Sequence, residues 1–152
     1  MTIYIAHRGN INGQNPDFEN KIDYLNNAIN LNYGVEFDVM FYKNGLYLGH
    51  DEPQEKLELN LIHKPNTFVH AKDLDALELL LKLDCNVFWH ETDKITITNK
   101  GFIWCFPGVF VKSNLAVWLD LHNKPLPNII NDIYGVCGDY ASILKKRDKT
   151  CQ

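Results

Sequence analysis

Hydrophobic and polar positions follow two different periods along the first half of the chain. Over residues 34–42 apolar and charged side chains alternate from one position to the next. Val35 and Phe37 are expected to face one way and Glu36 and Asp38 the other. This is the period of a β-strand. Short runs rich in β-branched and aromatic residues predict further strands. These lie over residues 2–6, 46–48, 67–71 and 86–89.

Two segments between these strands have the period of an α-helix. The first opens at Pro16-Asp17, where the Asp17 side chain is expected to cap the free amides, and it ends near Tyr33-Gly34. Asp73 is expected to cap the second helix. The predicted buried stripes are Phe18, Ile22, Leu25 and Ile29 in the first helix and Leu74, Leu77 and Leu81 in the second.

Alternating strands and helices favour a parallel sheet with helical crossovers, and hence an α/β fold. We expect a TIM-type (β/α) barrel, but such barrels have about 250 residues and this chain has 152. The barrel should therefore be shortened or incomplete, with helices missing in its second half and residues 1–152 forming one domain. The second half predicts strands over 94–98, 102–106, 115–121 and 135–138, then a helix over 140–146.

Composition narrows the class of protein. The formal net charge is −4, which argues against a nucleic-acid partner because a binding face for phosphate backbones is basic. Apolar runs all fall short of the roughly 18 residues of a spanning helix, so no transmembrane segment is expected. Cys85, Cys105, Cys137 and Cys151 are widely scattered, which predicts reduced, packed thiols and a cytoplasmic protein.

Two polar clusters stand at predicted strand ends, where parallel α/β folds carry their sites. His7-Arg8-Gly9 follows the first strand and is interpreted either as a solvated loop or as part of a site. A histidine there can move protons near neutral pH, and an arginine can hold a phosphate. Glu36 and Asp38 share one strand face, which is either the solvent side of an edge strand or the buried side of an internal one. The expected fold makes the strand internal, and buried carboxylates need a cation or protons between them. Oxygen ligands of this kind suit Mg²⁺ or Ca²⁺.

A hairpin is expected to return His50 to the carboxylate strand. Asn44-Gly45 is a strong two-residue turn signal. Counting outward from Lys43 paired with Leu46 places His50 opposite Val39, on the face away from Asp38. A bend at Gly49 is then required to aim His50 at the site.

Lys72 and His70 belong to the end of the strand over residues 67–71. Lys72 is interpreted either as a solvated strand end or as a positive charge beside a phosphate. His70 is interpreted either as a core histidine or as a metal ligand.

These residues together resemble the glycerophosphodiester phosphodiesterase family, a TIM-barrel group related to phosphatidylinositol-specific phospholipases C. The family has a His-Arg-Gly strand end, a Pro-Glu-Asn-Thr helix start, a Glu-x-Asp strand, a Lys-Asp-Gly-like turn and a His-Asp pair. The matching segments agree in order and spacing over residues 3–52, and two looser matches follow them. The matches are His7-Arg8-Gly9, Pro16 to Asn20, Glu36-Phe37-Asp38, Lys43-Asn44-Gly45, His50-Asp51, then Phe68 to Lys72 and Gly135 to Tyr140.

The resemblance implies a phosphoric diester hydrolase of lipid metabolism, acting on a small-molecule or lipid-headgroup phosphodiester with a divalent cation, Mg²⁺ or Ca²⁺. His70 stands where the family has a glutamate as its third metal ligand. It is therefore a candidate ligand that offers a neutral nitrogen instead of a charged oxygen. The implied roles are His7 and His50 as acid and base, Arg8 and Lys72 on the phosphate, Glu36, Asp38 and His70 on the metal, and Glu19 in support.

Two other functions fit the same residues. A degenerate barrel that binds phosphorylated ligands without turnover is favoured by the short chain and by His70. A metal-assisted lyase or isomerase would use the same side chains on another reaction. Turnover and product analysis separate the three hypotheses.

Overall fold

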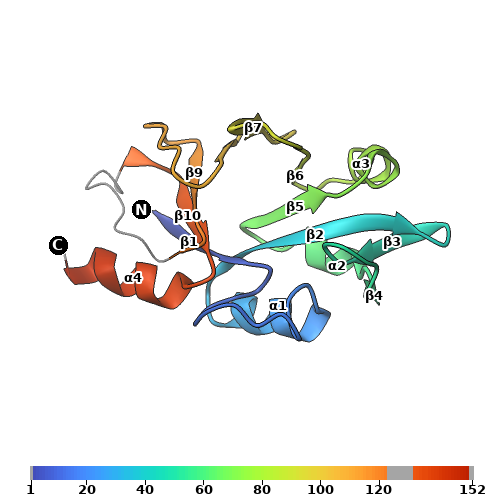
Figure 1. Cartoon of the computed structure of the whole chain (residues 1–152), viewed down its shortest axis with the longest axis horizontal. Helices are drawn as coiled ribbons and strands as arrows, with labels where there is room; N and C mark the ends of the chain where they lie inside the picture. Colours follow the sequence, from blue (N-terminus) through green and yellow to red (C-terminus); the bar gives the residue numbers. More distant parts are fainter. Residues whose placement is uncertain (1, 123–131, 151–152) are drawn as a thin grey trace.

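The computed structural model describes residues 2–122 and 132–150. Within these residues seven strands run parallel, in the spatial order β6-β5-β2-β1-β10-β9-β8 (Figure 1). They are β1 (Ile3–His7), β2 (Gly34–Tyr42), β5 (Thr67–Ala71), β6 (Val87–Phe88), β8 (Ile103–Cys105), β9 (Ala116–Asp120) and β10 (Gly135–Gly138). Three antiparallel strands extend them, namely β3 (Gly45–Leu48) on β2, β4 (Glu55–Lys56) on β3 and β7 (Ile95–Ile97) on β8.

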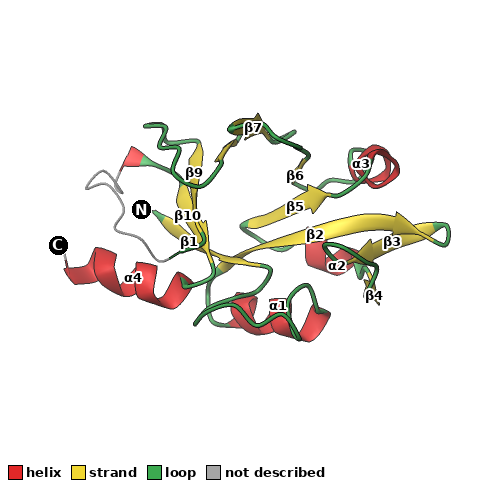
Figure 2. Cartoon of the chain, viewed as in Figure 1, coloured by secondary structure: helices red, strands yellow, loops and turns green. Residues whose placement is uncertain are grey.

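The helices are unevenly distributed along the chain (Figure 2). Helix α1 (Ile22–Asn30) joins β1 to β2, α2 (Leu59–Ile62) precedes β5, α3 (Leu74–Leu80) follows β5, and α4 (Ala141–Thr150) follows β10. From β6 to the end of β9 the described chain has strands, turns and loops but no helix. The mixed α/β class predicted from the sequence is confirmed. Helix α4 ends four residues beyond the predicted segment, and α2 and β4 were not predicted.

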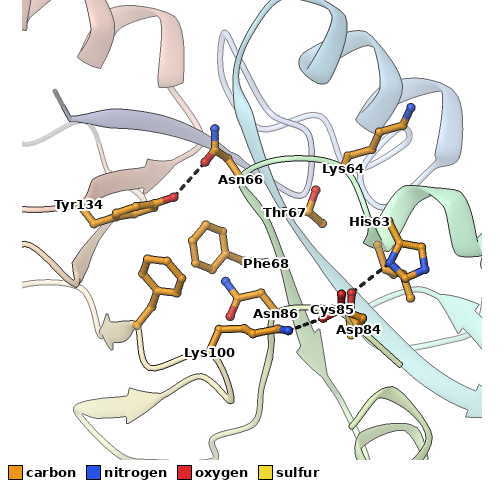
Figure 3. Close-up of a pocket in the computed structure, with 12 residues that line it drawn as sticks. His63, Lys64, Asn66, Thr67, Phe68, Asp84, Cys85, Asn86, Lys100 and Tyr134 are labelled. Carbon is orange, nitrogen blue, oxygen red and sulfur yellow. Dashed lines mark hydrogen bonds and ion pairs between the residues drawn. The ribbon is translucent and has the colours of Figure 1, made fainter. Parts of the chain in front are cut away.

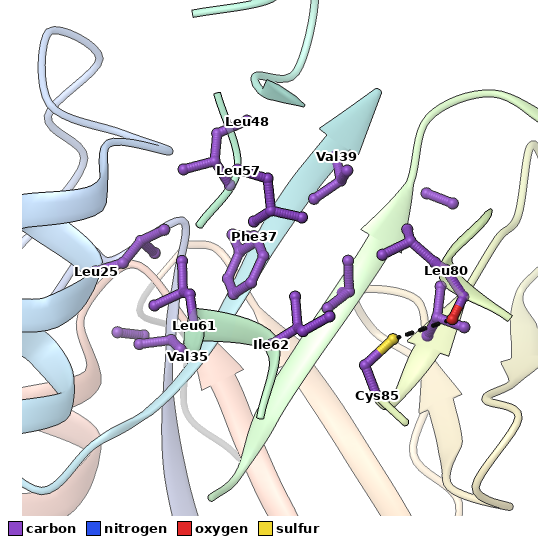
Figure 4. Packing of buried hydrophobic residues seen from close by; sticks show 14 of the residues in the cluster. Leu25, Val35, Phe37, Val39, Leu48, Leu57, Leu61, Ile62, Leu80 and Cys85 are labelled. Atoms are coloured by element: carbon purple, nitrogen blue, oxygen red, sulfur yellow. Dashed lines mark hydrogen bonds between the residues drawn. The ribbon is translucent and has the colours of Figure 1, made fainter. Parts of the chain in front are cut away.

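Buried hydrophobic side chains form three clusters on the two faces of the sheet, one of them around Trp118 of β9 and Leu144 of α4. On one face, Val35, Phe37 and Val39 of β2 pack against helices α1 and α2, through Leu25 and Leu61 (Figure 4). The other face carries Glu36 and Asp38, and below them lies a second cluster drawn from six of the parallel strands. Its buried members are Ile5, Phe68, Phe88, Trp104, Val117 and Cys137. The alternation predicted from the sequence thus separates two faces. One face is apolar, and the other carries charged side chains at the carboxyl ends of the strands and apolar side chains nearer their amino ends.

Asn99, in the turn between β7 and β8, forms hydrogen bonds to residues in and just before β6. Its backbone N–H donates to the carbonyl of Val87 at 3.0 Å, and its Oδ1 accepts from the Val87 N–H at 2.9 Å. Its Nδ2 also donates to the carbonyl of Cys85 at 3.0 Å. Nearby, the rings of Phe88 and Trp104 stack with centroids 4.6 Å apart. These hydrogen bonds hold the turn between β7 and β8 against β6.

We expect Asn99→Ala to lower the free energy of unfolding by about 1–3 kcal/mol, because it leaves the Val87 amide and the Cys85 carbonyl without their partner. Chemical denaturation measures this loss. Asn114→Ala, a change at an exposed asparagine, is the control and should alter stability by less than about 0.5 kcal/mol. Equal effects of the two substitutions would show that Asn99 does not stabilise the contact between this turn and β6.

The first helix begins later than predicted. Residues 16–20 form turns, and α1 starts at Ile22 with Lys21 at its cap. Asp17 does not cap it; instead the Glu55 carboxylate of β4 accepts from the Ile22 N–H at 2.9 Å. Phe18, predicted as part of the buried stripe, is 52% exposed. A cap delivered from a distant strand leaves no local signal in the sequence.

The third helix has the predicted cap but a different buried face. Asp73 accepts from the Ala76 N–H at 2.7 Å, as expected. The buried side chains are Ala76 and Leu80, whereas Leu74 and Leu81 are exposed. In a segment with leucines on every side, hydrophobicity alone does not select the face that meets the sheet.

The β2–β3 hairpin has a different register from the predicted one. Tyr42 pairs with Gly45 and Val39 with Leu48, so the turn residues are Lys43 and Asn44. Both have positive φ, at 45° and 59°, as two-residue hairpin turns require. The predicted pairs of Lys43 with Leu46 and Val39 with His50 are therefore wrong, because the turn sits one residue earlier.

Cys85, Cys105 and Cys137 are free and buried, as predicted; Cys151 lies outside the described residues. Burial raises the pKa of each of these three thiols, that of Cys85 to about 11. The described residues include no helix with the length and apolar character needed to cross a bilayer.

Candidate active site

Charged side chains from four neighbouring strands meet at the carboxyl ends of the sheet. Paired registers place His7 beside Glu36 and Asp38 beside His70, and Asp139 directly follows β10. Carboxyl ends of adjacent parallel strands form one rim. Residues that are up to 132 positions apart in the sequence therefore share one site.

Asp38 is the centre of this site. Its Oδ2 lies 3.0 Å from Arg8 Nε and accepts from Asn20 Nδ2 at 3.0 Å. Its Oδ1 lies 3.0 Å from His70 Nδ1 and 3.8 Å from Lys72 Nζ. Burial alone would raise the pKa of Asp38, but His70 and the charge of Arg8 hold it well below its usual range. Asp38 is therefore ionised although its side chain is buried.

Glu36 lies in the opposite electrostatic situation. It is 2% exposed, and its Oε2 stands 3.8 Å from His7 Nε2. Burial and the neighbouring charge of Asp38 raise the pKa of Glu36 above its usual value. The two carboxylates thus differ in their hold on a proton, although they are only two residues apart on one strand face.

His7 is held by a carboxylate that the sequence reasoning gave no role. Its Nδ1 lies 2.7 Å from Asp139 Oδ1, which also accepts from Asn10 Nδ2 at 2.9 Å. Gln14 Nε2 donates to the other Asp139 oxygen at 2.9 Å. With Asp139 accepting the Nδ1 proton, Nε2 is left facing Glu36. Asp139 thereby fixes both the tautomer and the direction of the ring.

Asp139→Asn should lower the pKa of His7. Burial lowers this pKa, but the hydrogen bond to Asp139 and the charges of Glu36 and Asp139 together raise it above its ordinary value. The stabilisation from the His7 proton is therefore present below the unfolded pKa and is lost as pH rises through the folded one. NMR titration of the His7 ring protons measures the shift. A His7 pKa unchanged in Asp139→Asn would contradict this pairing.

Glu19, predicted as a supporting residue, contacts the site through two partners. Its Oε2 lies 3.3 Å from an Arg8 terminal nitrogen, and its Oε1 accepts from Asn10 Nδ2 at 2.7 Å. Arg8 is therefore held between Glu19 and Asp38. The loop after β1 orients the guanidinium while keeping it partly open to solvent.

His50 reaches the same region by the bend anticipated at Gly49. Gly49 has φ of 147° and donates its N–H to the Asp38 carbonyl at 3.1 Å. A Cβ there would lie 2.0 Å from the Glu52 carbonyl oxygen, so only glycine fits. His50, with Nδ1 2.7 Å from Asp51, lines a pocket of about 460 Å³ with Arg8 and Glu19. Among the described residues, no hydrogen bond or ion pair joins His50 to His7 or to Glu36.

His70 lies flat against two aromatic neighbours. Its ring is stacked with Phe88 at 4.9 Å and with His90 at 4.7 Å, with planes 6° and 4° apart. His70, Lys72 and His90 line a second pocket of about 350 Å³. The site therefore has a pocket on each side, one beside Arg8 and His50 and the other beside His70 and Lys72.

A third pocket, of about 280 Å³, lies at the other ends of the strands (Figure 3). Thr67, the first residue of β5, and Asn86, the residue before β6, line it together with Tyr134. Lys100 and Asp84 form an ion pair at its edge. It contains none of the residues predicted for the site.

The structure offers one set of described residues suited to a metal ion. Ligand atoms of Glu36, Asp38 and His70 lie within 4.8 Å of one another. Asp38 Oδ1 is fully buried, with His70 Nδ1 at 3.0 Å and Lys72 Nζ at 3.8 Å. A cation between the Glu36 and Asp38 carboxylates would offset their mutual repulsion. The donor set thus fits a divalent cation.

Family models, curated proteins and solved structures were all compared with the chain, and none matches it. The function of the site therefore has to be inferred from its own residues. Three side chains that sequence reasoning left without a role belong to it, namely Asn10, Asn20 and Asp139. Asp139 had a usable signal, since it directly follows a predicted strand, whereas the two asparagines lie in a loop.

Proposed function

We propose that this protein is a metal-dependent phosphodiester hydrolase of the glycerophosphodiester phosphodiesterase type. One observation carries the proposal. An oriented imidazole, a guanidinium, an ammonium and a buried carboxylate pair converge on one rim, through His7, Arg8, Lys72, Glu36 and Asp38. Positive groups for a phosphate and a proton-transfer group are the parts that phosphoryl chemistry needs.

We also propose that the sheet closes into a shortened TIM-type barrel. Two observations support closure. The cluster around Phe68 draws side chains from six parallel strands, as a barrel interior does. Asn99 joins the loop after β7 to β6, the strand at the far end of the parallel order. The rim that carries the site would then be the carboxyl-terminal mouth of the barrel, where such folds hold their active sites.

The chain's own groups divide the work in the proposed reaction. Arg8 and Lys72 hold the phosphate oxygens on either side of Asp38, and Asp38 keeps both cations aligned. His7 exchanges a proton through Nε2, while Asp139 stabilises the charged ring. His50, in the pocket beside Arg8, is its partner for the second proton transfer. A divalent cation held by Glu36, Asp38 and His70 would supply further positive charge to the developing oxyanion.

Hydrolysis of bis(4-nitrophenyl) phosphate and of glycerophosphodiesters tests the proposal. Release of the alcohol should require an added divalent cation and should stop with excess chelator. Titration calorimetry with glycerol phosphate, run in parallel, measures ligand binding. Ligand binding without turnover under every divalent cation would overturn the enzyme proposal and favour a phosphate-binding module. A product other than the alcohol and its phosphomonoester or cyclic phosphate would indicate a different reaction.

A further inference from the structure

We propose that this site selects a first-row transition cation, such as Co²⁺ or Zn²⁺, over Mg²⁺ and Ca²⁺, and that His70 makes the selection. The inference rests on the proposed function, since it names the metal of the same site. The expectation of Mg²⁺ or Ca²⁺ came from the carboxylates of Glu36 and Asp38, with His70 as a candidate third ligand. The structure places the His70 Nδ1 nitrogen 3.0 Å from Asp38 Oδ1.

The spacing of the donors fits a single small ion. Asp38 Oδ2 is occupied by Arg8 and Asn20, which leaves Oδ1 as the ligand atom. Oδ1 lies 3.0 Å from His70 Nδ1. Neighbouring ligands of a six-coordinate ion with bonds of about 2.1 Å stand about 3.0 Å apart. Glu36 completes a set of two oxygens and one nitrogen within 4.8 Å.

A nitrogen ligand changes the ranking of metals. Imidazole binds zinc, iron and nickel well, whereas Mg²⁺ and Ca²⁺ prefer oxygen donors throughout. Ca²⁺ collects six to eight oxygens, far more than Glu36 and Asp38 provide. In this donor set His70 therefore favours a transition cation over both alkaline-earth ions.

Nearby positive charges act in the same direction. Arg8 Nε lies 3.0 Å and Lys72 Nζ 3.8 Å from Asp38 oxygens, so much of the carboxylate charge is already offset. Hard cations depend on that charge for their affinity. Coordination by the His70 nitrogen depends on it less, because imidazole binds as a neutral ligand.

The surroundings of His70 hold it in the coordinating position. The rings of Phe88 and His90 are stacked parallel to the His70 ring. This stacking restricts rotation of the imidazole about its Cβ–Cγ bond. His90 lies just after the end of β6, the strand paired with β5. A fixed imidazole loses little freedom on binding a metal. The stack therefore acts as a support for a nitrogen ligand.

Metal titrations of the metal-free protein test this inference without any turnover. Calorimetry with Co²⁺, Mn²⁺, Mg²⁺ and Ca²⁺, together with the visible absorption of bound Co²⁺, gives each affinity. We expect Co²⁺ to bind at least about 100-fold more tightly than Mg²⁺ or Ca²⁺. His70→Glu should reduce that ratio by at least about 10-fold, while His63→Ala, at a histidine that contacts the Asp84 carbonyl instead, should leave it unchanged.

Equal affinity for Co²⁺ and Mg²⁺ in the natural chain would overturn the inference, and so would an unchanged ratio in His70→Glu. If His70→Glu does not fold, His70→Gln serves in its place and must weaken Co²⁺ binding by at least about 10-fold. A selective metal site in a protein that hydrolyses no phosphodiester would overturn the proposed function alone. An active enzyme that prefers Mg²⁺ would overturn only the choice of metal.

Discussion

His7→Ala is expected to lower the rate of metal-dependent phosphodiester hydrolysis by about 10²- to 10⁴-fold, the usual contribution of a positioned acid or base. The reason lies in the geometry, since Asp139 holds His7 Nδ1 at 2.7 Å and leaves Nε2 directed to the site. The loss should appear in kcat rather than in KM, because proton transfer acts on the transition state. Steady-state kinetics on bis(4-nitrophenyl) phosphate measures both quantities.

The comparison with His50→Ala makes this test sharper. If His50 is the second proton-transfer group, its removal should also cost at least about 10²-fold, and the double variant should lose less than the product of the two. His63→Ala is the matched control, because His63 lies at the pocket on the opposite ends of the strands. Wild-type rates in both His7→Ala and His50→Ala would end the enzyme proposal.

Asp38→Asn should destabilise the metal-free protein by about 3 kcal/mol, because breaking a buried ion pair leaves its partners uncompensated. Asp38 is 1% exposed, and Arg8, His70 and Lys72 all lie within 3.8 Å of its oxygens. The pKa of Asp38 is lowered in the folded state. Its stabilising effect is therefore present above the unfolded pKa and is lost as pH falls through the folded one.

Glu36→Gln should move stability in the opposite direction and provides the matched control. The folded protein raises the pKa of Glu36, through burial and the charge of Asp38, so above that pKa the ionised Glu36 costs stability. A neutral amide of the same shape removes this cost, and we expect Glu36→Gln to be at least as stable as the natural chain at pH 8. Urea denaturation of both variants gives the two signs. Equal destabilisation by the two substitutions would show that the two carboxylates do not differ as the structure indicates.

Such a difference is informative about function. A buried carboxylate that destabilises its own fold is retained where it has chemistry to perform. Glu36 fits this description, because a bound cation would offset the charge that the fold tolerates poorly. Added divalent cation should therefore raise the melting temperature of the natural chain more than that of Glu36→Gln.

Local pattern predicted much of the rim. The alternation over β2 placed Glu36 and Asp38 together on the face away from Val35 and Phe37, and the hydrogen-bonded sheet has this arrangement. The strand ends correctly located His7 and His70. These features depend on residues one or two positions apart, so the sequence carries them directly.

Non-local contacts explain the errors. The cap of α1 comes from Glu55, 33 residues away from Ile22, and no local motif announces it. The hairpin turn shifted by one residue because Lys43 takes a positive φ of 45°, which is uncommon for a long side chain. In α3 the position of the sheet, rather than the hydrophobicity of Leu74 and Leu81, selected the buried face.

The sequence by itself determined the α/β class, the faces of the strands and the residue types available at their ends, because periodicity and strand order are properties of neighbouring positions. Only the tertiary structure decided which groups meet. It brought Asp139 to His7 across 132 residues, stacked His70 on Phe88 and His90, and gave Asp38 and Glu36 opposite pKa shifts. Coulombic and desolvation energies depend on distance and burial in three dimensions, and neither is a property of a position in the chain.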